Sequence, residues 1–428
     1  MTEVGATSGP VARGSVARVG AATALTALCG YAIIYLAARD LAPGGFSVFG
    51  VFWGAFGLVT GATNGLLQET TREVRANRHF AGSDTPPGPN GTRTHPLRIA
   101  ALVGVAAAVV IAGSSPLWSP RVFVAERWLS VALLGVGLAG FCLHATLLGM
   151  LAGTDQWTQY GALMVTDAVI RVSVAAATFT LGWGLAGFLW ATVAGAVAWL
   201  IMLVASPAAR LAARARTPGG AATFLRGATH SITAAGASAI LVMGFPVLLK
   251  LTSAELGAQG GVIILAVTLT RAPLLVPLTA MQGNLIAHFV DERNDRLRAL
   301  LAPAGAIGGI GVLGVLAAGV VGPWLLRVGF GAQYQASGAL LAWLTAAAVA
   351  IAMLTLTGAA AVAAALHQAY SLGWVVATAA SGLLLMVPLP LPARTVIGLL
   401  CGPLVGIAVH VVALSRAGRF PGATVSWV

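Results

Sequence analysis

Apolar segments of about 20 residues recur along the whole chain, and they restrict its fold more than any other feature. A segment of this length and composition crosses the hydrocarbon core of a membrane as one α-helix. Charged residues make up only 8% of the 428 residues, against about 25% in soluble domains. This excludes a soluble enzyme, a disordered tail and a fibrous protein. The sequence predicts an all-α polytopic membrane protein.

The apolar segments predict twelve membrane spans in two parallel lobes of six helices around a central cavity. We place the spans at 16–38, 45–67, 99–118, 128–152, 158–181, 184–205, 227–249, 261–282, 300–325, 337–361, 369–388 and 395–415. Residues 1–206 are expected to form the first lobe and residues 227–428 the second. Residues 68–97 are expected to be a flexible cytoplasmic loop, and residues 207–226 a basic cytoplasmic linker between the lobes.

Two similar turns support a parallel repeat. The first span is followed by DLAPGG at residues 40–45, and the seventh span by ELGAQG at residues 255–260. Each turn has an acidic residue, a Leu and small residues, and each leads into another span. Because the first and seventh spans run in the same direction, the two halves are expected to be related by an axis along the membrane normal.

The basic residues predict the orientation of the chain. Sixteen of the 24 lie on the side that holds both termini, six lie on the opposite side, and Arg171 and Arg271 lie inside spans. Cytoplasmic segments are enriched in basic residues, so both termini are expected on the cytoplasmic side of a bacterial cytoplasmic membrane. The net charge of +12 is therefore a topology signal, and it requires no nucleic-acid partner. No cysteine spacing indicates a metal site, and no cofactor is expected.

Three ionisable residues inside spans are the candidate site. Asp167 and Arg171 are four residues apart, so they lie on one helix face and form either a self-neutralising structural pair or part of a functional cavity. Arg271 has no acidic residue within one helical turn. An anionic ligand such as phosphate is favoured for Arg271 over an acidic partner from another helix, because a guanidinium binds phosphate with two parallel hydrogen bonds.

Other polar and aromatic residues in the spans have a functional and a structural interpretation. Four of them end spans near the cytoplasmic face, where they either line a cavity entrance or cap helices: Asn64, Gln68, Gln282 and Asn284. Three histidines lie in separate spans, where a hydrogen bond to a neighbouring helix is favoured over a proton relay: His144, His230 and His410. The aromatic stripe on residues 46–56 is expected to pack against helices or lipid rather than against an isoprenoid tail.

Catalytic motifs are absent from the sequence. It contains no Walker A motif, no GxSxG or HExxH pattern and no clustered carboxylates within the spans. Asp40 is a single acidic residue in a short outer loop, so a polyprenyl-phosphate glycosyltransferase ranks lowest among the alternatives. The chain is predicted not to be an enzyme.

Four stretches of the sequence carry a resemblance to a known family: Tyr35–Phe56, Gly65–Val74, Leu269–Phe289 and Gly322–Leu344. They resemble the corresponding spans of the multidrug/oligosaccharidyl-lipid/polysaccharide (MOP) exporter superfamily, and specifically its bacterial polysaccharide flippase (Wzx-like) branch. The similar stretches lie in both halves, so the resemblance covers essentially the whole chain.

The resemblance implies a flippase that moves a polyprenyl-(pyro)phosphate-linked sugar or oligosaccharide by alternating access, for synthesis of a cell-envelope polysaccharide. It implies that Arg271 and Arg171 bind the phosphate, with Asp167 supporting them or coupling an ion. The implied partners are the lipid-linked glycan, membrane lipids and envelope glycosyltransferases, with the flippase itself a monomer. Two alternatives rank lower. Drug exporters rely on a carboxylate that the first span lacks, and major facilitator transporters carry a Gly-x-x-x-Asp-Arg signature that the loop after the second span lacks.

Overall fold

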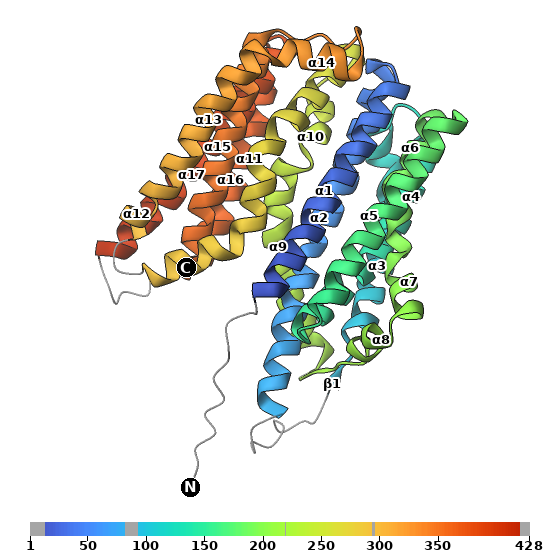
Figure 1. Ribbon diagram of the computed structural model, residues 1–428, viewed down its shortest axis with the longest axis vertical. Coiled ribbons are helices and arrows are strands. Elements are labelled where there is room, and N and C mark those ends of the chain that lie inside the picture. Colours follow the sequence, from blue (N-terminus) through green and yellow to red (C-terminus); the bar gives the residue numbers. More distant parts are fainter. Residues whose placement is uncertain (1–12, 82–92, 219, 293–295, 420–428) are drawn as a thin grey trace.

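The computed structural model describes residues 13–81, 93–218, 220–292 and 296–419 (Figure 1). This part of the chain contains 11 helices that are long and apolar enough to cross a membrane, or 12 if the bent pair α9 and α10 forms one span. Its only strands are β1 (Arg93–Thr94) and β2 (Thr217–Pro218), which pair antiparallel. The prediction of an all-α polytopic membrane protein is confirmed.

The helices before residue 214 pack on one another. They are α1 (Arg13–Asp40), α2 (Pro43–Ala81), α3 (Pro96–Val122), α4 (Arg127–Gly153), α5 (Trp157–Leu181), α6 (Gly184–Ala194), the 3-10 turn η1 (Gly195–Val197), α7 (Ala198–Ala205) and α8 (Pro207–Ala213). In this N-terminal group, α4 packs against α2 and α3, and α1 packs against α5.

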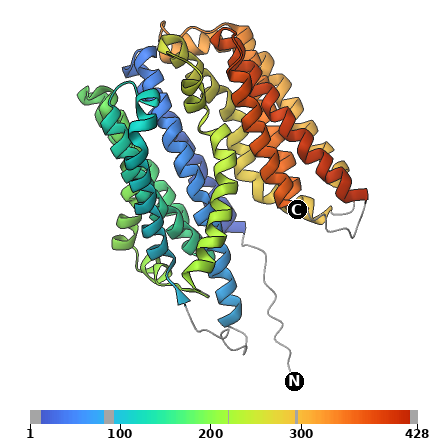
Figure 2. The same cartoon turned by 180° about the vertical axis from the view of Figure 1, so that it is seen from behind.

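The helices after residue 220 form a second group, seen best from behind in Figure 2. They are α9 (Ala221–Val242), α10 (Phe245–Leu251), α11 (Gly257–Asp291), α12 (Arg296–Ala299), α13 (Leu301–Val320), α14 (Gly322–Phe330), α15 (Gly338–Ala363), α16 (His367–Leu385) and α17 (Leu391–Arg419). In this C-terminal group, α15 packs against α11, α13 and α17, and α17 also packs against α16. Helix α9 differs, because its main neighbour is α2 of the N-terminal group.

The turns between α4 and α5 and between α15 and α16 have the same backbone geometry. Asp155 and Ala365 both adopt a left-handed conformation with φ of 58°. The next amide in each turn donates to a carbonyl five residues earlier, from Gln156 to Leu151 (2.8 Å) and from Leu366 to Ala361 (2.9 Å). These turns lie 210 residues apart, so this part of the chain repeats in parallel, as the sequence predicts.

The two groups meet at the end of the molecule opposite the termini and diverge towards the termini (Figure 1). At the closed end, an added Cβ on Gly261 of α11 would overlap with the carbonyl of Pro43, and residues 260–267 are all buried. We call this the outer end, following the predicted topology. Beyond Arg271 the described residues of α11 are mostly partly or fully exposed, although Phe289 near its end is buried against the C-terminal group.

Two expected connecting segments are partly helical. Helix α2 continues to Ala81, so the expectation of a loop over 68–97 is wrong for residues 68–81, while residues 82–92 lie outside the described part. No Gly or Pro interrupts residues 68–81, and ion pairs at helical spacing stabilise this extension. The expected linker 207–226 also contains α8 and the start of α9, because Ser206 caps α8 by accepting from the Ala209 amide (3.2 Å).

The predicted span over 227–249 corresponds to α9 and α10, between which the chain bends by 68°. Gly244 and Pro246 explain the bend. Gly244 ends the first segment, and Pro246 has no amide hydrogen to donate to the carbonyl of Val242. Met243, which lies in this bend, lines the cavity described below.

The aromatic stripe of α2 packs inside the protein, which confirms that interpretation. Phe49, Phe52 and Phe56 are almost fully buried. Their rings contact rings of three other segments, with centroids 5.9 Å from Phe188, 6.0 Å from Phe123 and 5.4 Å from Phe141 respectively. These contacts fix the helix that forms one wall of the main cavity.

Candidate functional site

A cavity of about 310 Å³ lies within the N-terminal group, at the middle of its spans. Its walls come from α1, α2, α4, α5 and α6, and Met243 at the end of α9 closes one side. Its polar lining consists of Thr26, Thr60, Thr63, Asn64, His144, Asp167, Arg171 and Thr192. Two of the three ionisable residues predicted inside the spans therefore share one cavity.

Asp167 and Arg171 form an ion pair in this cavity. Nε of Arg171 donates to Oδ1 of Asp167 at 3.0 Å, with side chains that are 16% and 11% exposed. The pair lies against the 3-10 turn η1, where an added Cβ on Gly195 would overlap with Asp167 Oδ1. The sequence predicts the pairing, and the structure adds that a glycine is required at the turn that covers it.

The guanidinium of Arg171 lies against two aromatic rings that also contact each other. Its Cζ lies 5.3 Å from the ring centroid of Phe56 and 4.9 Å from that of Phe141. Both contacts stabilise the cation through the ring faces. Nη1 and Nη2 have no hydrogen-bond partner among the described residues. The pair thus fixes one edge of the guanidinium and leaves its two terminal nitrogens available.

Other polar atoms at the cavity also lack partners. Nδ1 of His144 and Oγ1 of Thr26 are buried, and neither forms a hydrogen bond to any described residue. Asn64 lines the cavity and is exposed, and its place at an entrance stays a prediction. Buried polar groups are normally paired with protein, water or ligand. These two atoms are therefore exceptions to that rule within the described part of the chain.

The corresponding position of the C-terminal group is filled. With the 210-residue offset between the two turns, Ala377 and Ser381 of α16 are the positions equivalent to Asp167 and Arg171. Ser381 donates to the carbonyl of Gly398 at 2.9 Å, and an added Cβ on Gly402 would overlap with its hydroxyl. Small side chains thus bring α16 directly onto α17. The ion pair belongs to one half of the repeat only.

Arg271 lies outside this cavity, at the bend between α9 and α10. Its Nη1 donates to the carbonyl of Val242 (3.0 Å) and lies 3.5 Å from that of Leu241, and its Cζ is 5.4 Å from the ring centroid of Phe245. Arg271 thus satisfies carbonyls that the broken helix leaves without amide partners. Its Nη2 is buried and has no partner in the described part of the chain.

The remaining predicted site residues have varied surroundings. Gln68 is exposed and lies outside the set of residues that line the cavity, and the side chains of Gln282 and Asn284 are outside the described residues. His410 is fully buried between Thr357 Oγ1 (3.0 Å) and the carbonyl of Tyr370 (3.2 Å), as expected for a histidine bonded to neighbouring helices.

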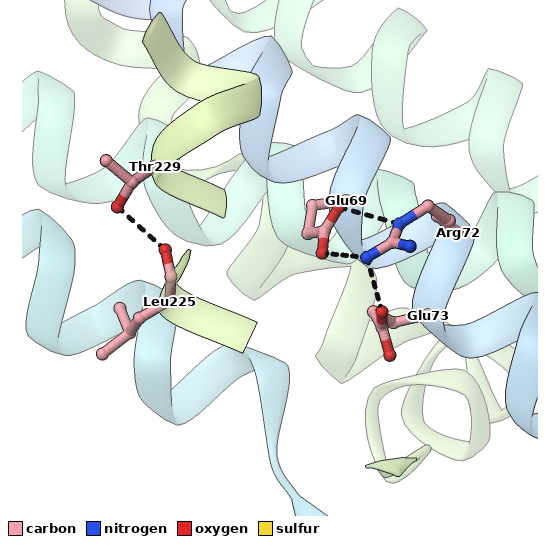
Figure 3. Close-up of polar contacts among 5 residues, drawn as sticks. All are labelled: Glu69, Arg72, Glu73, Leu225 and Thr229. Carbon is pink, nitrogen blue, oxygen red and sulfur yellow. Dashed lines mark hydrogen bonds and ion pairs between the residues drawn. The ribbon is translucent and has the colours of Figure 1, made fainter. Parts of the chain in front are cut away.

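Glu69 is a buried carboxylate that the sequence analysis missed, because it was assigned to a loop. Arg72 donates to it through Nε (3.0 Å) and Nη2 (2.6 Å), and Nη2 also reaches Glu73 at 2.7 Å (Figure 3). Glu69 lies against α9, where an added Cβ on Gly227 would overlap with its carboxylate. The helical spacing of Glu69, Arg72 and Glu73 is the signal that reveals it.

The chain closely resembles proteins of mycobacteria. It is 77% identical over 412 residues to uncharacterized protein Rv3630 of Mycobacterium tuberculosis, covering 96% of this chain and 94% of that protein. It is 73% identical over 419 residues to uncharacterized protein Rv1510 of the same species, covering 97% and 96% of the two chains. No protein-family model matches the sequence.

Solved structures share the fold at low sequence identity. An inward-facing multidrug resistance MATE family transporter of the MOP superfamily aligns with a TM-score of 0.72 and 16% identity, covering 93% of this chain and 96% of that one. The outward-facing conformation of such a transporter gives a TM-score of 0.66 at 15% identity, with 95% of both chains covered. A MOP superfamily transporter from Pyrococcus furiosus gives 0.61 at 14%, covering 95% and 96%. The chain therefore belongs to one family with these mycobacterial proteins, and it has the fold of the MOP transporter superfamily.

Proposed function

We propose that this protein is a flippase that carries a polyprenyl-(pyro)phosphate-linked sugar or oligosaccharide across the cytoplasmic membrane for envelope polysaccharide synthesis. The observation that carries the proposal is Arg171. An arginine in the middle of a span is costly, by about 3 kcal/mol on insertion scales. Here its two terminal nitrogens have no partners among the residues that the structure describes, and they lie beside a cavity. That arrangement suits an anionic ligand.

Phosphate fits the geometry of Arg171. The Asp167 contact at Nε and the rings of Phe56 and Phe141 hold the guanidinium plane, so little side-chain entropy is lost when a ligand binds. The two free nitrogens then match two phosphate oxygens. Because Asp167 already neutralises the cation, the ligand gains from hydrogen bonds and from low local dielectric more than from net charge.

The size of the cavity limits what it holds. A volume of about 310 Å³ is at the lower end of the range for small-molecule pockets, which is about 300–1,000 Å³. It accommodates a phosphate and a neighbouring sugar, while a prenyl tail must lie elsewhere. Helices α1 and α11 contact each other little, and Leu28 of α1 is 67% exposed. We place the tail in the lipid on this side of the molecule.

Helices α2 and α9 close the other side. An added Cβ on Gly61 would lie 2.7 Å from Ala239 Cβ, and one on Gly65 would overlap with the backbone of Ile232. We propose that residues 1–206 and 227–428 are the two moving lobes, with both termini cytoplasmic, and that the α2–α9 contact is the joint between them. The diverging ends would then open to the cytoplasm.

The second candidate, a small-molecule secondary transporter of the drug-export type, is favoured by the similarity to a multidrug resistance transporter. The cavity argues against it, because α1 contributes Thr26 and no carboxylate to the lining. The Pyrococcus furiosus relative of this fold is described as having a binding pocket of reversed polarity and a different function. The fold thus accommodates pockets of either charge.

A flipping assay tests the proposal. Proteoliposomes containing fluorescent polyprenyl-phosphate-linked sugar would be used with the unmodified protein, Arg171→Ala and the control Arg127→Ala. Arg127 packs on Trp128 at the start of α4, away from the residues of α4 that line the cavity. Loss of a charged hydrogen-bond pair, about 1.5–3 kcal/mol, predicts that Arg171→Ala slows flipping about 10- to 100-fold when rates are compared per folded protein. Flipping at the unmodified rate by Arg171→Ala, or transport of cations by the unmodified protein, would refute the proposal.

A further inference from the structure

A second pocket lies at the outer end, where the two groups meet. Its volume is about 220 Å³, and it is separate from the cavity around Arg171. The N-terminal group contributes Gly44, Ser47, Val48, Val51, Val122 and Val124 to its wall. The C-terminal group contributes Lys250 and residues 255–257. The pocket therefore exists because α2 and α3 lie against α10 and the start of α11.

Lys250 is the chemically distinctive residue of this pocket. It is the single lysine of the chain, whose other 23 basic residues are arginines. Lys250 is only 8% exposed, and its Nζ donates to the carbonyl of Ala254 at 3.0 Å. An ammonium group has three hydrogens to donate. The described residues accept one of them, which leaves two donors of a buried cation beside the pocket.

Two long helices begin at the same pocket. Helix α2 begins at Pro43 and helix α11 at Gly257, and Gly44 and Gly257 are among the lining residues. The first amides of a helix have no acceptor within it, and the helix dipole adds partial positive charge there. The Gly44 and Gly45 amides have no acceptor among the described residues. Both helix ends therefore favour an anion at this place.

Neighbouring charges agree with this assignment. Arg394 donates through Nη1 to the carbonyl of Thr252 (2.8 Å) and through Nη2 to Ser253 Oγ (2.6 Å), so a second cation lies beside the turn that follows Lys250. Glu255 is the acidic residue of the pocket wall. It is exposed and therefore screened by water and salt, whereas the charge of buried Lys250 is screened much less.

We propose that this outer pocket binds one phosphate group through Lys250 and the start of α2. The volume is below that of pockets for drug-sized molecules, so a single phosphate fits, either as the free ion or as the headgroup of a membrane lipid. The site does not depend on the identity of the transported substrate.

Chemical labelling of Lys250 tests the proposal directly. A membrane-impermeant amine-reactive reagent would modify the full-length protein, and mass spectrometry of the peptide containing Lys250 would report the labelling rate. Bound phosphate must lower that rate, because it occupies the free donors of the amine. One arm adds inorganic phosphate to protein in phosphate-free detergent, with sulfate-free sodium chloride at equal ionic strength as the reference. The other compares vesicles of phosphatidylglycerol and phosphatidylcholine with vesicles of a phosphate-free galactolipid.

We expect at least a fivefold protection in one arm. Protection by inorganic phosphate identifies the free ion, and protection by phospholipid relative to galactolipid identifies a headgroup. Equal labelling rates under all conditions would overturn the proposal.

A matched pair of glycine variants separates ligand binding from general shielding of the lysine. An added Cβ meets no atom within 4 Å at Gly44 in the pocket or at Gly305 on α13. Gly44→Leu fills the pocket and keeps Lys250, so protection should be lost, while Gly305→Leu should behave as the unmodified protein. Undiminished protection in Gly44→Leu would place the phosphate elsewhere and refute the site.

Discussion

Removal of Asp167 and Arg171, singly and together, decides between the structural and functional interpretations of their pair. Asp167→Ala leaves the Arg171 guanidinium in the middle of a span, where its remaining described contacts are the two aromatic rings. Arg171→Met leaves a carboxylate against the η1 turn at Gly195. Neither side chain is more than 16% exposed, so each single variant resembles the breaking of a buried pair.

The expected magnitudes follow from that burial. Breaking a buried pair costs about 3–5 kcal/mol. The cavity admits water and two ring faces support the cation, so we expect about 2–3 kcal/mol for Asp167→Ala and a similar loss for Arg171→Met. The double variant removes both charges and should be more stable than the sum of the single changes predicts, by about 2 kcal/mol or more.

Unfolding of the purified protein in mixed micelles, followed by tryptophan fluorescence, measures the three variants. The flipping assay is then applied to the double variant. A purely structural pair predicts that the well-folded double variant still flips lipid-linked sugar, whereas the proposed phosphate site predicts that it does not. Strictly additive losses of stability would refute the inference that the two charges compensate each other in the folded protein.

Three further outcomes are expected. Gly195→Ala should destabilise the protein by about 1–3 kcal/mol in the same unfolding assay, because the new methyl overlaps with Asp167, while Gly113→Ala, where no atom lies within 4 Å, should change stability little. Arg271→Met should leave the carbonyl of Val242 unpaired and speed hydrogen exchange at the α9–α10 bend, and unchanged exchange there would contradict its capping role. In intact cells the impermeant amine reagent should label Lys250, since α10, which carries this lysine, lies towards the end opposite the termini (Figure 1); labelling only after lysis would reverse the predicted orientation.

The fold was largely predictable because the membrane imposes it. Apolar length identifies the spans, and the two junctions at Gly182 and Ala365 are real breaks, each with a residue in the left-handed conformation. The sequence analysis did not predict the last part of α2. It assigned these charged residues to a loop because hydropathy alone ends the membrane span before them. Their spacing at Glu69, Arg72 and Glu73 stabilises a helix that continues past the hydrophobic segment.

The candidate site was predictable only within a helix. The four-residue spacing of Asp167 and Arg171 fixes their contact locally, so the sequence is sufficient for it. The partners of Arg271 come from residues 241–245, about 30 positions earlier, and depend on a bend that brings α9 carbonyls to α11. Such a contact is a consequence of tertiary packing, and no spacing rule reveals it. An apparently unpaired arginine in a sequence is therefore weak evidence for a ligand when a helix break lies nearby.

The unequal use of the two repeats gives the most direct functional argument. Both halves share the same turn geometry at Asp155 and Ala365, so the backbone does not dictate where a cavity forms. In the C-terminal group, Ser381 lets α16 pack directly against α17. In the N-terminal group, Arg171 is too large for such packing, and it lines a cavity together with the two aromatic rings that it contacts. A buried arginine costs stability that a serine would not. Its presence in only one repeat therefore supports the proposal that a ligand binds in the N-terminal group, since the helices at the corresponding position of the C-terminal group pack directly on each other.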